Sequence, residues 1–117
     1  HPAEIRQSIL SIKQLYEGRR IKAIFQPHLY TRTRDFYRDF ADALSLLDDV
    51  AIVDIYPARE QPIPGVTSRL IYEKQLCTKD EICDIVRQGG FDVLVTLGAG
   101  DIENYADEIT QILTQEK

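Results

Sequence analysis

The sequence has only two cysteines among its 117 residues, Cys77 and Cys83. They do not form a C-x-x-C pair, and no further cysteine pair or pair of histidines lies nearby, which a zinc site would need. We therefore expect no metal site and assign both cysteines to packing in the core. A disulfide between them is disfavoured in a reducing compartment.

Long apolar runs and runs of basic residues are also missing. No apolar segment approaches the ~20 residues that cross a bilayer, and no signal peptide precedes the first expected helix, so we expect a cytoplasmic chain without a membrane partner. The net charge of −5 and the lack of any run of four or more Lys or Arg argue against a nucleic-acid partner. We assign four basic residues to a solvated face and the end of the first helix: Lys13, Arg19, Arg20 and Lys22.

What the sequence does contain is an alternation of helix and strand patterns. Apolar spacing predicts helices over residues 2–18, 33–47, 79–88 and 102–113. Apolar runs predict strands over residues 20–25, 50–56 and 91–97, with a short strand at 74–77 after an irregular stretch at 57–68 and a short helix at 68–73. Thr78 and Glu81 have the spacing of a capping box. With no repeat, low-complexity segment or linker, we expect one α/β domain over residues 1–117, with a mainly parallel sheet and helices on both faces.

Ligands of such sheets bind beyond the carboxyl ends of the strands, where three loops should meet. The first, "QPHLYTRT", offers His28, Tyr30, Arg32 and, just beyond it, Arg34, and an arginine fork can bind two oxygens of a carboxylate or phosphate. The same residues also fit a plain helix entrance, in which a threonine caps the helix and the arginines lie in solvent. From spacing alone both interpretations stay open.

The other two loops carry weaker signals. "GAGD", with Gly98, Gly100 and Asp101, lacks the lysine of a phosphate-binding loop and the full dinucleotide pattern, and the aspartate would repel an anion. A helix cap is the simpler interpretation. In the stretch 57–68, Arg59 and Glu60 are the charged candidates, and its length is the argument against a plain exposed crossover.

Four segments together carry a resemblance to a known family: "HPAEI", "FQPHLYTRTRDF", "YPAREQPIPGVTS" and "TLGAGDI". In order and spacing they resemble the C-terminal domain of the Mur ligases, and specifically of the members that add L-alanine. The resemblance covers nearly the whole chain and implies a Rossmann-like three-layer sandwich. Because the sequence opens at His1, inside the family's "GHHP" segment, we expect a domain excised from a three-domain enzyme.

The resemblance implies a cytoplasmic step of peptidoglycan synthesis, in which ATP drives the joining of L-alanine to UDP-N-acetylmuramate through an acyl phosphate. In such an enzyme ATP and Mg²⁺ are bound mainly by a central domain, which this chain lacks, together with the UDP-sugar domain. The sequence has no phosphate-binding P-loop. We therefore expect the isolated domain to hold no cofactor and to have no ligase activity.

The resemblance also implies roles for single residues. It assigns no catalytic residue to this domain and gives four substrate-binding residues: His28, Tyr30, Arg32 and Asp101, the last toward the alanine ammonium. We expect the rim of the site at His1, Glu60, Gly98 and Gly100. Leu29 departs from the family, where many members have arginine, and either Arg34 or a residue of another domain could take that place.

Two other functions fit the fold pattern. A stand-alone module that binds a small carboxylate or nucleotide would use the same loops for recognition only. A receiver-like regulatory domain would need an acidic pair, an aspartate at a strand end and a later lysine, and we find no such set in the sequence.

Overall fold

The computed structural model describes residues 1–72, 75–98 and 100–115, with backbone only at residues 101 and 115. Its elements follow the expected alternation: α1 (Pro2–Leu15), β1 (Ile21–Gln26), α2 (Tyr30–Leu44), β2 (Asp49–Val53), η1 (Ser68–Leu70), β3 (Leu76–Cys77), η2 (Lys79–Glu81), α3 (Ile82–Gln88), β4 (Val93–Gly98), η3 (Asp101–Tyr105) and α4 (Ala106–Gln115). None of the helices in this described part is long and apolar enough to span a membrane.

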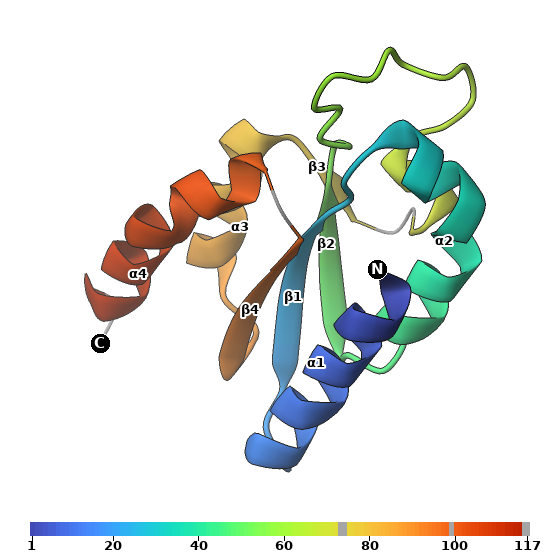
Figure 1. The fold of residues 1–117 in the computed structure, drawn as a ribbon. Helices are drawn as coiled ribbons and strands as arrows, with labels where there is room; N and C mark the ends of the chain where they lie inside the picture. Colours follow the sequence, from blue (N-terminus) through green and yellow to red (C-terminus); the bar gives the residue numbers. More distant parts are fainter. Residues whose placement is uncertain (73–74, 99, 116–117) are drawn as a thin grey trace.

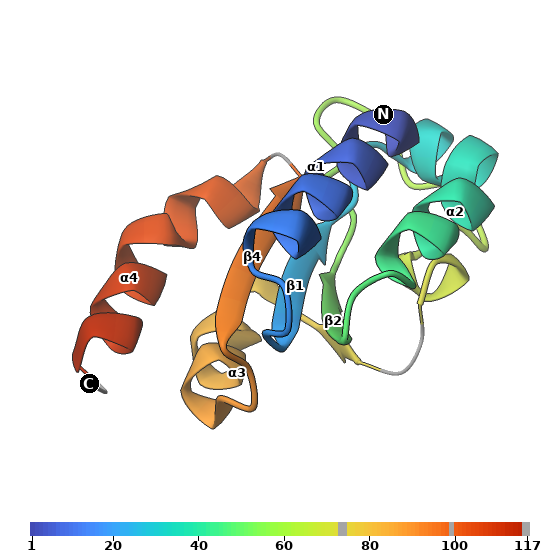
Figure 2. The same ribbon diagram turned by 90° about the horizontal axis from the view of Figure 1, so that it is seen from below.

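The strands form one parallel sheet in the order β3-β2-β1-β4. β1 lies in the middle and every one of its residues is buried, which matches the nearly continuous apolar run in its sequence. Helices flank the sheet on both sides, α1 and α2 on one face and α3 and α4 on the other (Figures 1 and 2). The predicted three-layer α/β fold with a mainly parallel sheet is confirmed.

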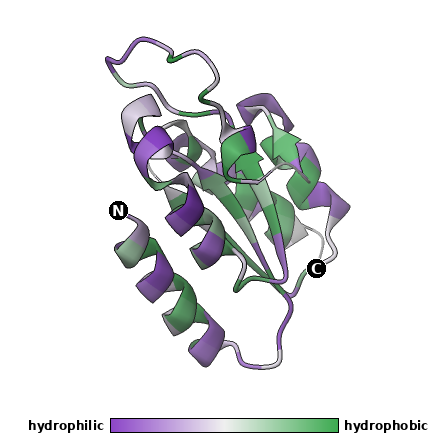
Figure 3. Ribbon diagram, turned by 90° about the vertical axis from the view of Figure 1, so that its right-hand side faces the viewer, coloured by the Kyte–Doolittle hydropathy of each residue, from purple (hydrophilic) through white to green (hydrophobic). Residues whose placement is uncertain are grey.

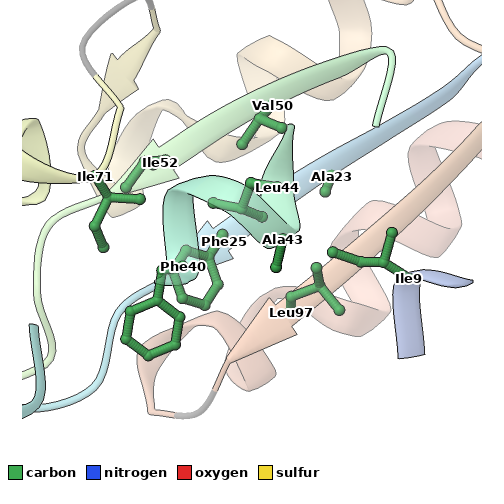
Figure 4. Packing of buried hydrophobic residues seen from close by; sticks show 10 residues of the cluster. All are labelled: Ile9, Ala23, Phe25, Phe40, Ala43, Leu44, Val50, Ile52, Ile71 and Leu97. Atoms are coloured by element: carbon green, nitrogen blue, oxygen red, sulfur yellow. The ribbon is translucent and has the colours of Figure 1, made fainter. Parts of the chain in front are cut away.

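Each face of the sheet has its own hydrophobic core, because successive side chains of a strand point to opposite faces. Ala23 and Phe25 of β1 pack with α1 and α2, where Phe25 meets Phe40 at 5.5 Å between ring centroids (Figure 4). Ile24 faces the opposite core, under α3 and α4. Hydropathy follows this division, with apolar residues concentrated on the strands and polar ones on the outer faces of the helices (Figure 3).

Burial of Lys22 contradicts its assignment to a solvated face. Its side chain is 5% exposed and forms an ion pair with Asp49 (3.1 Å), while its Nζ donates a hydrogen bond to Oε1 of Gln75 (3.1 Å). A lysine in a buried strand needs such partners to offset the loss of water. They come from elsewhere in the sheet region, so local spacing could not reveal them.

Helix α2 begins three residues earlier than expected. It starts at Tyr30, not Thr33, and Leu29 precedes it with a φ of 71°. Thr33 is therefore inside the helix, fully buried, and its hydroxyl donates a hydrogen bond to the carbonyl oxygen of Leu29 at 2.9 Å. The prediction that the helix begins at Thr33 was wrong.

The other predicted boundaries shift by up to four residues: β2 ends at Val53 and not at residue 56, and α4 begins at Ala106 and not at residue 102, after η3. The capping box forms, because the Glu81 carboxylate accepts hydrogen bonds from the backbone N–H (2.9 Å) and the hydroxyl (3.1 Å) of Thr78. η2 then leads into α3. The predicted strand at 74–77 is reduced to Leu76–Cys77, and position 74 and the end of the short helix at position 73 lie outside the described residues.

Candidate functional site

A cavity of about 350 Å³ opens at the carboxyl ends of β1 and β4. This is the point of the sheet where the chain leaves β1 toward one face and β4 toward the other (Figure 1), and in open parallel sheets ligands bind at such switch points. The residues that line it come from α1 and the residue before it, from β1, α2 and β4, and from the loop between β1 and α2: His1, Glu4, Ile5, Ser8, Phe25, Gln26, His28, Arg32, Phe40, Thr96, Leu97 and Gly98.

The loop that carries His28 is held in place by Tyr56, which lies just after the end of β2. The backbone N–H of Leu29 donates to the carbonyl oxygen of Tyr56, and the N–H of Tyr56 donates to that of Pro27, both at 2.9 Å. The rings of His28 and Tyr56 are stacked, with centroids 5.7 Å apart and planes 16° apart. His28 therefore reaches the cavity from a loop that two backbone hydrogen bonds and an aromatic contact hold in place.

Arg32 lines the cavity from the first turn of α2. Its side chain is exposed and, within residues 1–72, 75–98 and 100–115, forms no hydrogen bond or ion pair. Arg34 differs, because its Nε is 2.9 Å from Oδ1 of Asp35, and this hydrogen bond raises the pKa of Arg34. Arg34 does not line the cavity. Of the two arginines, Arg32 is the one free to bind an anion there.

His1 lines the same cavity but also begins α1. Its Nδ1 accepts a hydrogen bond from the backbone N–H of Ala3 at 3.3 Å, and its ring lies against Phe36 with centroids 5.5 Å apart. Together His1, His28, Arg32 and Glu4 give the cavity its charged and titratable side chains. Of these groups, the Arg32 guanidinium is the one that suits a small carboxylate or another anion.

The turn after β4 is built around close packing. Gly98 pairs with Gln26, and a Cβ on Gly98 would collide with the Gln26 carbonyl oxygen. A Cβ on Gly100 would collide with the ring of Tyr56. The Gln26 side chain closes the region, since its Oε1 accepts from the backbone N–H of Ile102 (2.8 Å) and its Nε2 donates to the carbonyl oxygen of Asp54 (3.3 Å).

The expected site residues thus divide into two groups. The structure brings His1, His28, Arg32 and Gly98 together in one cavity. Three others do not line it: Tyr30, Glu60 and Gly100. The side chain of Asp101 lies outside the described side chains.

Sequence reasoning missed two residues of this region, Gln26 and Tyr56. Gln26 is almost completely buried at the end of an apolar strand, and a polar residue in such a position is itself a signal, because burial of an amide requires hydrogen-bond partners. Tyr56 is the last residue of the predicted strand and precedes a proline, so the sequence indicates only the end of a strand there. Its contacts with His28 and Gly100 depend on the neighbouring strands and have no local signal.

In the described part of the turn after β4, one backbone donor is already engaged. The N–H of Ile102, which a phosphate at this turn would need, is already bonded to Gln26, and the sequence has no P-loop. Among the described residues, no group of three or more His, Cys, Asp or Glu side chains is arranged so that it could hold a metal ion.

A parallel sheet flanked by helices, with a cavity at its switch point, defines the class of Rossmann-like α/β domains. No family model matches the chain. Two curated relatives do, over almost its whole length: UDP-N-acetylmuramate–L-alanine ligase of Phocaeicola vulgatus is 61% identical over 98% of the chain. The same ligase of Parabacteroides distasonis is 54% identical over 99%. The chain belongs with these ligases, the MurC family, as a segment of them.

The chain spans about a quarter of the length of these relatives, 27% and 26%. The fold agrees with a solved structure, that of UDP-N-acetylmuramate-alanine ligase MurC from Thermotoga maritima. It superimposes with a TM-score of 0.75 over 100% of this chain and 25% of that one, at 24% sequence identity. The resemblance to the alanine-adding Mur ligases is confirmed.

Proposed function

We propose that this chain is the C-terminal, amino-acid-binding domain of a cytoplasmic ligase that uses ATP to join L-alanine to UDP-N-acetylmuramate in peptidoglycan synthesis. One observation carries the proposal: His28 and Arg32 line a single cavity at the switch point of the sheet, in a chain closely similar to named ligases of this kind. ATP with Mg²⁺ and the UDP sugar would bind mainly to two further domains. The similarity to segments of ligases favours this role over a stand-alone module or a receiver-like domain.

Within the cavity, Arg32 is assigned to the carboxylate of alanine. Its guanidinium has no partner among the described residues and can meet both carboxylate oxygens at once. His28, held by Tyr56, would add a hydrogen bond at the same end of the amino acid. Asp101, which follows the turn after β4, would meet the ammonium group by charge attraction.

The test is the substitution Arg32→Ala in the full-length ligase that contains this segment. We expect the KM for L-alanine to rise about ten- to hundredfold, because hydrogen bonds to charged groups contribute roughly 1.5–3 kcal/mol. The KM for ATP should stay unchanged. Arg34→Ala is the matched control: the same charge is lost two residues away, but that side chain pairs with Asp35 outside the cavity.

Near-normal alanine kinetics of Arg32→Ala, or an equal effect of Arg34→Ala, would refute the assignment. A second assay concerns the 117-residue chain alone, which should show no ATP-dependent ligation of alanine because it has no P-loop. Ligation by this chain alone would contradict the proposed division of labour among the domains.

A further inference from the structure

The charged residues at the N-terminus of helix α2 have the sign that disfavours a helix start. Its preceding residue, Leu29, provides no side-chain hydrogen bond, and its first turn contains no acidic residue. Arg32 lies in that turn and Arg34 just after it, although the positive end of the helix dipole repels cations. The free N–H groups of such a helix need an acceptor from elsewhere.

Glu60 is that acceptor. One oxygen of its carboxylate accepts a hydrogen bond from the backbone N–H of Thr31 at 3.1 Å, and the other accepts from the Thr31 hydroxyl at 2.5 Å. The hydroxyl hydrogen bond lowers the pKa of the Glu60 carboxyl, opposed in part by desolvation. A glutamate 29 positions later in the chain thus replaces the local cap.

The segment that carries Glu60 is itself constrained. The backbone N–H of Glu60 donates to the carbonyl oxygen of Pro57 at 2.9 Å, and the turn between them contains Ala58 with a φ of 53°. Among the described residues, Ala58 and Leu29 are the only non-glycine residues with positive φ. Strained backbone persists where the surrounding structure enforces it and is frequent at functional sites. Leu29 lies between β1 and α2, and Ala58 lies in the segment after β2. The hydrogen bonds of Tyr56 and Glu60 join these two segments.

We propose that Glu60 is a positioning residue for alanine binding: by holding both donors of Thr31, it fixes the first turn of α2 and with it the direction of Arg32. This inference rests on the proposed function of Arg32. Glu60 does not line the cavity, so it acts through the helix and not by contact with the substrate.

The experiment is a double-mutant cycle of Glu60→Ala and Arg32→Ala in the full-length ligase. We expect Glu60→Ala alone to raise the KM for L-alanine about tenfold, as the loss of a helix cap of roughly 1.4 kcal/mol would, and to leave the KM for ATP unchanged. In the Arg32→Ala background it should add less than about twofold, because the group that it positions is then absent.

Three further variants sharpen the result. Thr31→Val removes the hydroxyl donor but keeps the backbone N–H, so it should raise the KM for alanine by a smaller factor. Glu60→Gln retains one carbonyl acceptor and should rescue part of the loss in Glu60→Ala. Glu17→Ala, at an exposed site near the opposite edge of the sheet, should change nothing. If Glu60→Ala does not fold, Thr31→Val and Glu60→Gln replace it in the double-mutant cycle with Arg32→Ala.

The failure of this inference is distinct from that of the proposed function. An effect of Arg32→Ala with none of Glu60→Ala overturns the positioning role alone, as does a full tenfold effect of Glu60→Ala in the Arg32→Ala background. A lower unfolding temperature of Glu60→Ala with unchanged alanine kinetics also overturns it, because the cap would then be structural only. No effect of Arg32→Ala overturns both.

Discussion

The close approach of β4 to β1 at Gly98 yields a quantitative prediction about the wall of the cavity. Gly98 has a φ of 105°, and a Cβ built on it would collide with the carbonyl oxygen of Gln26 and lie 3.1 Å from its carbonyl carbon. Both atoms belong to the paired backbone of the central strand, which cannot turn away as a flexible side chain could. Gly98→Ala should therefore force the two strand ends apart.

The expected cost has two parts. An L-residue in the left-handed region loses roughly 1–2 kcal/mol, and an overpacked contact in a rigid core loses about 1–3 kcal/mol more, so the free energy of unfolding should fall by about 2–5 kcal/mol. Gly90→Ala separates these parts. Gly90 has a φ of 86°, but no atom lies within 4 Å of its hypothetical Cβ, so only the conformational part should appear.

Equilibrium urea unfolding of the 117-residue chain and its two variants measures the difference directly. Gly98→Ala should lower the midpoint clearly more than Gly90→Ala, at equal m-values. Equal losses in the two variants would show that the Gly98 contact with Gln26 does not restrict the site, and the description of a tightly packed turn after β4 would be refuted.

Two other predictions concern hydrogen bonds within the chain. Thr33→Val removes the buried hydroxyl that donates to the carbonyl oxygen of Leu29 and should lower the free energy of unfolding by about 1–2 kcal/mol. Thr110→Val, the control at an exposed hydroxyl, should change it by no more than about 0.5 kcal/mol. Equal losses would contradict a stabilising role of the buried Thr33 hydrogen bond. The backbone N–H of Thr78 lowers the pKa of Glu81, so its stabilisation is present above the unfolded-state pKa and is lost as pH falls through the folded-state pKa. Thermal unfolding of Glu81→Gln should show lower stability at neutral pH and a shallower decline in acid, and an unchanged acid profile would refute it.

The features that sequence predicted correctly depend on local patterns. The capping box of Thr78 and Glu81 lies within four consecutive residues, and apolar spacing was enough to place the helices and strands in order. The parallel sheet followed from their alternation, since strands separated by helices pair in parallel. The meeting of His28 and Arg32 at one cavity was within reach for the same reason, because both follow the end of one strand.

The features that sequence missed depend on partners far along the chain. Lys22 looked solvated because Asp49 and Gln75 are distant in sequence. The predicted start of α2 is three residues too late because the helix is capped by Glu60 and not by a threonine or aspartate next to its first residue. In both cases the partner of a polar group lies far away in the sequence, so local patterns cannot identify it.

The cap by Glu60 restricts how the length of its loop can vary. Three residues separate Tyr56, which backbone hydrogen bonds join to the loop after β1, from Glu60, which is hydrogen-bonded to α2. An insertion between them would carry the carboxylate away from Thr31, while residues 61–65 are mostly exposed and make none of these contacts. Natural length variants and engineered insertions should therefore be accommodated at residues 61–65, and excluded from the three residues between Tyr56 and Glu60.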